Sequence, residues 1–302
     1  MIAIYKRDLK GFFTGMMGYV LLAFFLAVGG LYFTVMNLMS GYPDLSYTLY
    51  NNLFVLLVLV LIPHVGITRN NATRWLGIGE VLTFQPSEIA KFAVVLYFAD
   101  SISKKKDKMQ TLRYGIIPYA IILLVIAALM MLEPHLSGTV LILGAGAILM
   151  LVGGISWIWV MSALGVGAAG FLFLIKVVGY GQSRVAMWLN PWLDARGDGY
   201  QMVQSLLSIG SGGLLGVGLG KSRQKFLYLP EEHNDFIFSI VCEELGLIGA
   251  TVIMMLFAAL ILRGYWIALH ARDRFGSLLA VGMTSLLAMQ VFLNIGVVSG
   301  LL

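Results

Sequence analysis

The stretch Gly199–Gly249, GYQMVQSLLSIGSGGLLGVGLGKSRQKFLYLPEEHNDFIFSIVCEELGLIG, decides how the rest of the chain is understood. Its first half is rich in glycine, and an apolar run begins at Phe236. Between the two lie a basic and then an acidic group: Lys221, Arg223 and Lys225, followed by Glu231, Glu232 and Asp235. Charged groups are costly inside the hydrocarbon of a membrane, so such a cluster beside an apolar helix is a candidate functional site.

The composition is that of a membrane protein. Of the 302 residues, 59% are hydrophobic and only 12% are charged, whereas a soluble domain carries about 25% charged residues. The net charge of +5 would suit nucleic acid in a soluble chain, but here the basic residues fall in short loops, as the positive-inside rule requires. We therefore predict an all-α, polytopic helical membrane protein with no nucleic-acid partner. The single cysteine, Cys242, excludes an internal disulfide and has no metal-ligand spacing.

Apolar runs of nearly membrane-spanning length predict about eight transmembrane spans. Their approximate ranges are 19–36, 53–67, 87–102, 116–132, a fifth that ends at 153–154, 157–178, 236–262, and 278 to the last residue. Residues 68–84 are predicted as a polar loop. Two loops are strongly basic, 103–114 and 263–274. Because four spans separate these loops, both can be cytoplasmic, and the long segment 179–235 is then external.

The first two spans conflict with this orientation. The N-terminus carries Lys6, Arg7 and Lys10, which predict a cytoplasmic start, but the next crossings would then place the 103–114 loop outside. Three explanations stay open: an inverted N-terminus, a first apolar run that does not cross, or a front end foreign to the rest.

Asp235 has two interpretations. Aspartate is a good helix N-cap, and this one directly precedes an apolar helix. Alternatively, neighbouring charges such as Glu231 and His233 tune its carboxylate as a general base.

The other charged groups also have two interpretations each. The basic residues of the long polar segment are either solvated loop charges or ligands of a pyrophosphate, assisted by N–H groups of the glycine-rich run: Arg184, Lys221, Arg223 and Lys225. No strand precedes GVGLG, so a dinucleotide site is not predicted, and glycines at helix crossings are favoured. Glu88 and Lys91, three apart on one helix face, form an ion pair or line an internal cavity, and the cavity is favoured. Glu243 and Glu244 have no cation near them in sequence and receive no role.

Four motifs follow one another along the chain: ATRWLGIG with QPSEIAK (72–91), EPHLSGT (133–139), RVAMWLNPW with GYQMVQS (184–205), and LGKSRQKFLYLPEEHNDFIFSIVCEELGLIG (219–249). Together they resemble the SEDS family (shape, elongation, division and sporulation), which includes FtsW, RodA and SpoVE. The resemblance covers about residues 60–302, and GLGKSRQKFLYLPE is most similar to the FtsW and SpoVE branches.

This resemblance implies a peptidoglycan glycosyltransferase in the bacterial plasma membrane that polymerises lipid II for cell division, sporulation or cell shape. It would work beside a class B penicillin-binding protein, with an active site facing the exterior and no cofactor. Asp235 corresponds to the family's catalytic aspartate. The residues expected to bind substrate are Arg74, Glu88, Lys91, Arg184, Gln201, Ser205, Lys221, Lys225, Glu231 and His233. The alternative is a lipid II flippase or a transport permease without catalysis.

The chain also departs from the family. His135 stands where relatives usually carry Asp. The family has ten spans, so the eight predicted here leave one family span missing at each end. About residues 1–50 resemble the start of an ABC-type export permease, and residues 1–52 are predicted as an atypical N-terminal segment. Residues 53–302 are predicted as the SEDS-type membrane domain.

Overall fold

The structure, a computed structural model, describes residues 66–69, 72–78, 82–133, 135–163, 165, 167, 182–224 and 235–301. The predicted span 19–36, residues 53–65 of the predicted span 53–67, and most of 157–178 lie outside these residues, whereas residues 66 and 67 belong to a strand and not to the predicted span. By its contacts the chain divides into two compact units, Met1–Ser101 with Ile121–Ile142, and Ile102–Ala120 with Leu143–Leu302. Helices dominate both units, which confirms the predicted all-α class.

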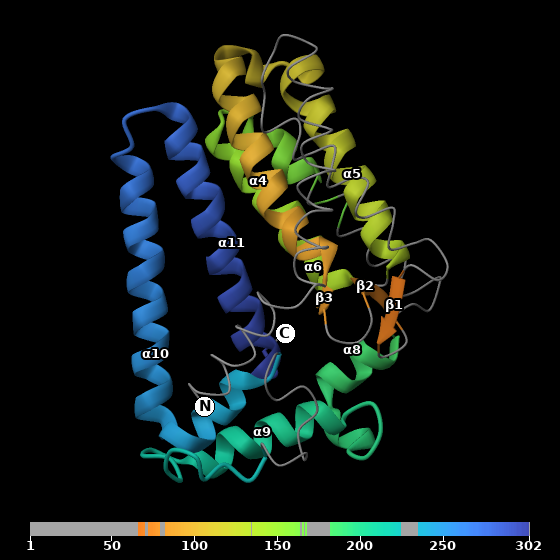
Figure 1. Cartoon of the computed structure of the whole chain (residues 1–302), viewed down its shortest axis with the longest axis vertical. Coiled ribbons are helices and arrows are strands. Elements are labelled where there is room, and N and C mark those ends of the chain that lie inside the picture. Colours follow the sequence, from red (N-terminus) through yellow and green to blue (C-terminus); the bar gives the residue numbers. More distant parts are fainter. Residues whose placement is uncertain are drawn as a thin grey trace. The chain divides into compact units, whose positions relative to one another are not determined.

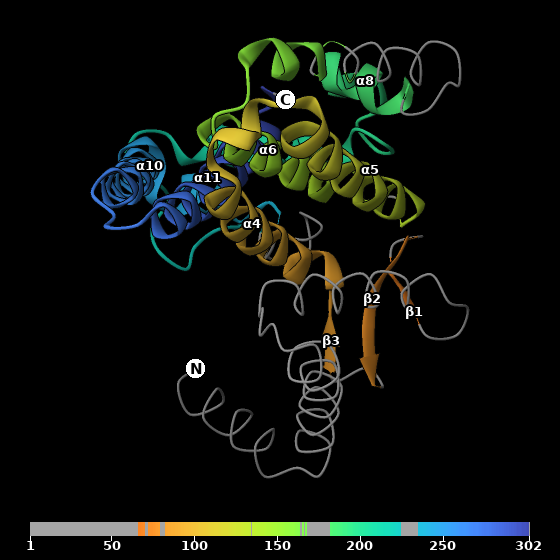
Figure 2. The ribbon, with the colours of Figure 1, turned by 90° about the horizontal axis from the view of Figure 1, so that it is seen from above.

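The first unit contains a small antiparallel sheet of order β1-β2-β3, whose strands lie side by side in Figure 2. The strands are β1 (Gly66–Arg69), β2 (Ala72–Ile78) and β3 (Leu82–Phe84). This sheet corrects the prediction of a polar loop over residues 68–84. The strands are only three to seven residues long, and such short runs leave little alternation for a pattern to detect.

Helix α4 (Pro86–Lys105) follows β3 directly. Proline at the first helical position loses no hydrogen bond, so Pro86 begins the helix as the sequence predicts. After the short helical turns η2 (Lys106–Gln110) and η3 (Leu112–Ile116) come α5 (Ile117–Leu132) and α6 (Leu136–Val152). The bounds of α5 agree with the predicted fourth span to within one residue.

The second unit contains the C-terminal helices. They are α8 (Gln182–Leu189), η4 (Pro191–Asp194), α9 (Tyr200–Gly212), α10 (Ile237–Leu269) and α11 (Arg274–Val298). Figure 1 shows α10 and α11 packed side by side, joined by a short turn. The prediction that a loop begins at residue 263 is wrong, because α10 continues to Leu269. Within the helix, the Arg263 guanidinium lies 4.0 Å from the Trp266 ring centre. A long basic side chain can reach the membrane surface without ending its helix.

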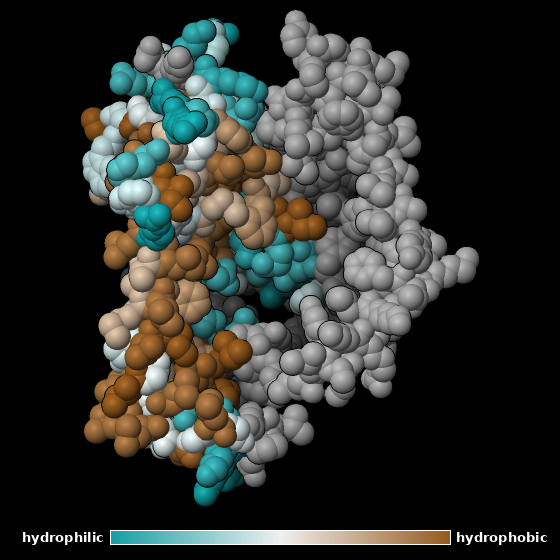
Figure 3. Space-filling view, turned by 60° about the vertical axis from the view of Figure 1, so that its left-hand side comes forward, coloured by the Kyte–Doolittle hydropathy of each residue, from teal (hydrophilic) through white to brown (hydrophobic). Residues whose placement is uncertain are grey.

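Three of the described helices are long and apolar enough to cross a membrane: Leu112–Leu132, Ile237–Leu269 and Arg274–Val298. Helix α6 is apolar but shorter. Leu256 and Leu262 of α10 are 65% and 70% exposed. In Figure 3 hydrophobic side chains cover much of the coloured surface, and hydrophilic ones gather at its top, at its bottom and in one group beside the grey residues. Apolar surface of this extent fits contact with lipid, and the protein is a multi-pass membrane protein.

The two basic loops lie at the same end of the second unit. Arg274 Nη2 donates a hydrogen bond to the carbonyl oxygen of Gly153, just after α6, at 2.9 Å. Gly153 also lies against Ile102 near the end of α4, since a β-carbon there would stand 2.5 Å from Ile102 Cγ2. The start of loop 103–114 and the end of loop 263–274 therefore meet at Gly153. This confirms the prediction that loops 103–114 and 263–274 share one side.

Candidate active site

Asp235 lies immediately before the first turn of α10. The helix begins at Ile237 and its N-cap position is Phe236, which provides no side-chain cap. Asp235 is exposed, and its backbone carbonyl accepts a hydrogen bond from Asn294 Nδ2 of α11 at 2.9 Å. The N-cap position of α10 therefore belongs to Phe236 and not to Asp235.

Three helices hold the backbone next to Asp235. Phe236 is buried against Val298 of α11 and packs on Ile209 of α9. The Ser205 hydroxyl of α9 donates to the carbonyl oxygen of Val298 at 2.6 Å and lies 2.7 Å from the Ser239 hydroxyl of α10. Asp235 is thus exposed to solvent, while the backbone next to it is held by contacts among α9, α10 and α11. Ser205 itself is fully buried and hydrogen-bonded between the helices, and its substrate contact stays a prediction.

Helix α11 separates Asp235 from the basic side of this unit. Arg274 at its start contacts Gly153, and Asn294 near its end contacts Asp235. Positions 274 and 294 lie 20 residues apart in one helix, which separates them by roughly 30 Å at 1.5 Å per residue. That length equals the hydrocarbon thickness of a typical bilayer, about 30 Å.

The glycine-rich run forms a loop between α9 and α10. A β-carbon at Gly212, the last residue of α9, would overlap the Cys242 carbonyl, as predicted for a helix crossing. Gly216 has a φ of 78°, and a β-carbon there would overlap the Glu244 carbonyl. Lys221 and Arg223 are exposed in this loop. Lys225, Glu231 and His233 lie outside the described residues.

The sequence pattern left Glu243 and Glu244 without a role, and the structure shows their partners. Both carboxylates accept hydrogen bonds from the loop that carries Lys221 and Arg223, and the Glu243 side chain also accepts from the Ser208 hydroxyl of α9 at 3.3 Å. The sequence did contain a signal for these contacts, namely two adjacent acidic residues within an apolar run. Carboxylates that are buried need hydrogen-bond donors, so such donors had to come from another part of the chain.

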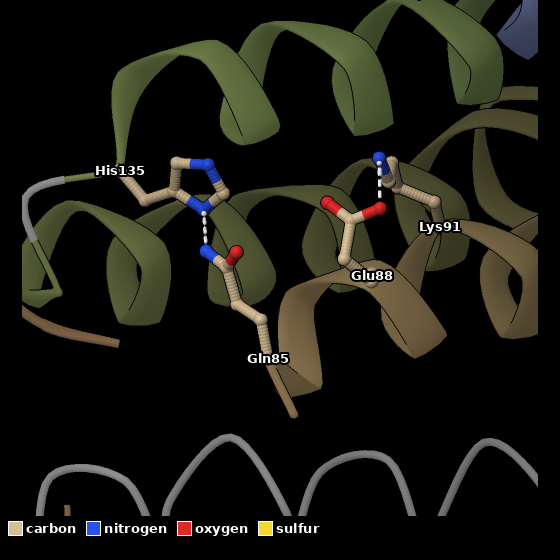
Figure 4. Close-up of polar contacts among 4 residues, drawn as sticks. All are labelled: Gln85, Glu88, Lys91 and His135. Atoms are coloured by element: carbon tan, nitrogen blue, oxygen red, sulfur yellow. Dashed lines mark hydrogen bonds and ion pairs between the residues drawn. The ribbon is translucent and has the colours of Figure 1, made fainter. Parts of the chain in front are cut away.

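The first unit holds a separate polar cluster, most of which Figure 4 shows. Lys91 Nζ lies 2.7 Å from Glu88 Oε2, so the predicted ion pair exists. Lys91 is buried, whereas the Glu88 side chain is 54% exposed. Gln85 Nε2 donates to His135 Nδ1 at 3.2 Å. Arg74 Nε of β2 donates to the carbonyl oxygen of Glu133 at 3.1 Å, which brings Arg74 to the same cluster.

Glu133 is the residue of this cluster that sequence reasoning missed. It lies directly after α5, outside the membrane-spanning segment, and is only 1% exposed. Neither carboxylate oxygen has a hydrogen-bond partner among the described residues. Burial raises the pKa of Glu133 to about 7, although the charge of Arg74 opposes this. Burial, together with Arg74 and Lys91, lowers the pKa of His135 to about 4 against the opposing effect of Glu88, so His135 is neutral at pH 7.

Two further predicted residues lie in the 179–235 segment. Arg184 belongs to α8, but its side chain is outside the described part. Gln201 lies in the first turn of α9 and is exposed. Within the described residues, no three His, Cys, Asp or Glu side chains gather as a metal site would require.

The family model for FtsW, RodA and SpoVE, described as a cell cycle protein, matches residues 5–302. The chain belongs to this family. Stage V sporulation protein E of Bacillus subtilis is 43% identical over 249 residues, which are 82% of this chain and 68% of that protein. The probable peptidoglycan glycosyltransferase FtsW of Geobacter sulfurreducens is 44% identical over 248 residues, 82% of this chain and 66% of that one. The FtsW/SpoVE resemblance is thus confirmed, and the chain spans about two thirds of the length of these relatives.

Two solved structures of similar fold agree with this membership. One, reported as a peptidoglycan synthase complex that coordinates polymerization and crosslinking, contains a chain with a TM-score of 0.69 and 26% identity. The match covers 99% of this chain and 85% of that one. The rod shape determining protein RodA of Thermus thermophilus has a TM-score of 0.58 and 26% identity, over 91% of this chain and 74% of that one.

The family match includes residues 5–52, and the division of the chain into two parts at residue 52 stays a prediction.

Proposed function

We propose that this protein is a peptidoglycan glycosyltransferase that polymerises lipid II into glycan strands. The observation that carries the proposal is Asp235, an exposed carboxylate fixed by three helices at the start of an apolar helix and not used as its N-cap. A relative 44% identical to this chain is named a probable peptidoglycan glycosyltransferase, and the resemblance of HNDFIF aligns Asp235 with the family's catalytic aspartate.

In this mechanism Asp235 accepts the proton of the acceptor sugar hydroxyl while that oxygen attacks the anomeric carbon of the donor. The bond from the anomeric carbon to the pyrophosphate oxygen breaks, and undecaprenyl pyrophosphate leaves with the electron pair. A single displacement inverts the anomeric centre and needs one base, unlike the two carboxyl groups of glycoside hydrolysis. Lys221 and Arg223 stabilise the growing negative charge of the leaving group.

The polar cluster of the first unit is proposed to bind the charged parts of lipid II. Arg74 and Lys91 supply positive charge, and Glu88 pairs with Lys91 at a position where its own side chain is half exposed. A partly solvated ion pair can exchange its partner for a phosphate, which favours binding over a purely structural role.

Asp235 is proposed to face the cell exterior. Both basic loops lie together at Gly153, and α11 places Asp235 roughly 30 Å away from them, about one hydrocarbon thickness. Because basic loops mark the cytoplasmic side, the opposite end of α11 is external. A class B penicillin-binding protein is the proposed partner, supported by the similar chain in a peptidoglycan synthase complex.

The test is polymerisation of labelled lipid II by the full chain in lipid vesicles, with and without a class B penicillin-binding protein. We expect glycan polymer from the wild type and none from Asp235→Asn. Asp273→Asn is the matched control, since Asp273 caps α11 at its other end and Asn caps equally well. A near-normal amount of polymer from Asp235→Asn would show that Asp235 is not the general base. Translocation of lipid II without polymer would favour a flippase.

A further inference from the structure

Helix α10 is interrupted in its third turn. Gly246 has φ 66° and ψ −170°, values outside the helical region. The next two N–H groups, of Leu247 and Ile248, donate to the carbonyl oxygens of Gly213 and Leu214 at 2.9 and 3.2 Å. In a continuous helix these N–H groups would bond to the carbonyls four residues earlier. The glycine-rich loop has therefore taken the place of a turn of the helix.

The carbonyl groups exposed by this break are also used by the loop. The carbonyl oxygens of Glu243 and Glu244 accept hydrogen bonds from the N–H groups of Val217 and Gly218 at 3.0 and 3.1 Å. Together with the two bonds beyond Gly246, four backbone hydrogen bonds connect the loop to both sides of the break. The four bonds give partners to backbone groups that the break leaves without intrahelical ones, so the break and the loop stabilise each other.

The side chains of the same two residues complete the attachment. Glu244 Oε2 accepts from Gly220 N at 2.9 Å, and its Oε1 accepts from Ser222 N at 3.3 Å. Glu243 Oε1 accepts from Arg223 N at 3.0 Å, and its Oε2 accepts from the Ser222 hydroxyl at 2.5 Å. All four carboxylate oxygens thus hold the loop segment 220–223. We call Glu243, Glu244 and loop 213–223 the glutamate clamp.

The glutamate clamp attaches the basic residues Lys221 and Arg223 to the same helix that follows Asp235. Lys221 and Arg223 lie in the segment that the carboxylates hold, and both side chains are exposed. Asp235 precedes the same helix, eight residues before Glu243, which corresponds to roughly 12 Å along a helix axis. The backbone donors lie on both sides of Lys221, at Gly220 and Ser222, and Arg223 donates its own N–H, so the hydrogen bonds are made at the basic residues themselves.

We propose that Glu243 and Glu244 are positioning residues that set Lys221 and Arg223 at a fixed distance from Asp235. The cations then meet the departing pyrophosphate at the moment when Asp235 takes the proton from the acceptor. The inference rests on the proposed glycosyl transfer and adds to it two residues that do not touch the substrate. Glu244→Gln is the informative change, because its amide NH₂ would face the N–H of Gly220 or Ser222, donor against donor.

The first measurement tests the glutamate clamp without any catalysis. Spin labels are attached at Leu219→Cys in the loop and Leu256→Cys on α10, both exposed positions, in a Cys242→Ala background of the full chain in lipid nanodiscs. Electron paramagnetic resonance should give one narrow distance between the labels. Glu244→Gln and Glu243→Gln should each replace it by a broad or shifted distribution. An unchanged distribution in both variants would overturn the clamp.

The second measurement asks whether the glutamates act through the cations. Glu244→Gln should lower the kcat of polymerisation by about 10- to 100-fold, the effect of misplacing a reacting group by about 1 Å. In a Lys221→Met, Arg223→Met background the same change should have little further effect, because coupled residues are not additive. The control Asp273→Ala removes a distant helix cap and should leave kcat unchanged.

The outcomes separate the two proposals. Equal fold-losses from Glu244→Gln in both backgrounds would show general destabilisation and overturn the positioning role. If the wild type makes no polymer, the glycosyltransferase proposal fails, and the label distances still decide whether the glutamate clamp exists.

Discussion

Replacing Glu133 by Gln should remove a pH dependence from the stability of this protein. The Glu133 side chain is 1% exposed, and its two carboxylate oxygens have no hydrogen-bond partner among the described residues. Burial raises the pKa from its ordinary 4.5 to about 7. The ionised form is therefore penalised in the folded state, and the glutamine side chain, which is neutral at every pH, avoids the penalty.

The size and sign of this change in stability follow from proton linkage. Raising a pKa from 4.5 to about 7 corresponds to about 3 kcal/mol at 1.36 kcal/mol per unit. The folded state holds the proton more tightly than the unfolded state, so this stabilisation is fully present below about pH 4.5. It is lost as the pH rises, and the loss is complete once the pH passes about 7. The wild type should therefore be less stable than Glu133→Gln at pH 8 by about 3 kcal/mol, and nearly equal to it at pH 4.5.

The assay is denaturant unfolding in detergent micelles at pH 5 and pH 8. Glu133→Gln should lose much less stability between the two pH values than the wild type does. Glu133→Asp, which keeps a carboxyl group, should retain a loss. His135 titrates near pH 4 in the fold and contributes equally to all three proteins, so it cancels in the comparison. If Glu133→Gln loses as much stability as the wild type, the buried carboxyl group of Glu133 is not the source of the pH dependence.

Two further predictions concern the ion pair and the topology. Glu88→Gln should cost about 1–3 kcal/mol because it leaves the buried Lys91 ammonium without this partner, whereas Lys91→Met leaves a half-exposed carboxylate and should cost about 1 kcal/mol or less. Equal costs, measured by the same unfolding assay, would contradict the burial that distinguishes the two side chains; the double variant should regain stability but not polymerisation. Single cysteines at Lys106→Cys and Arg196→Cys, in a Cys242→Ala background, should react differently with a membrane-impermeant thiol reagent in intact cells. Only position 196 should be labelled, and labelling of 106 alone would reverse the proposed orientation.

Local signals in the sequence predicted most of the described fold. The run before Leu132 is continuously apolar, and α5 ends there as expected. Pro86 marked the start of α4, and Gly153 marked the end of α6. The positive-inside rule placed both basic loops on one side, and the hydrogen bond from Arg274 to Gly153 agrees. These features depend on a few neighbouring residues, so hydropathy and charge suffice to find them.

The polar contacts were harder to predict because they join distant segments. Glu88 and Lys91 are one helical turn apart, and their ion pair was predicted from spacing alone. Glu133 lies 59 positions from Arg74, and no local pattern shows that strand β2 brings them together. The three short strands of this region were themselves missed, so the burial that sets the pKa of Glu133 could not be anticipated.

Glu243 and Glu244 show why a search for charge partners fails in such a chain. The search asks which cation neutralises a buried carboxylate, and around these two residues the sequence has none nearby. The partners are backbone N–H groups of residues 220, 222 and 223, together with the Ser222 and Ser208 hydroxyls, and a backbone donor leaves no mark on residue identity. The break at Gly246 was also hard to predict, because glycine in a membrane helix usually indicates close helix packing. Here it interrupts the helix. Two adjacent acids in an apolar run, with a glycine-rich loop before them, still require donors from some part of the chain. The glycines are what allow that loop to approach α10 closely enough to supply them.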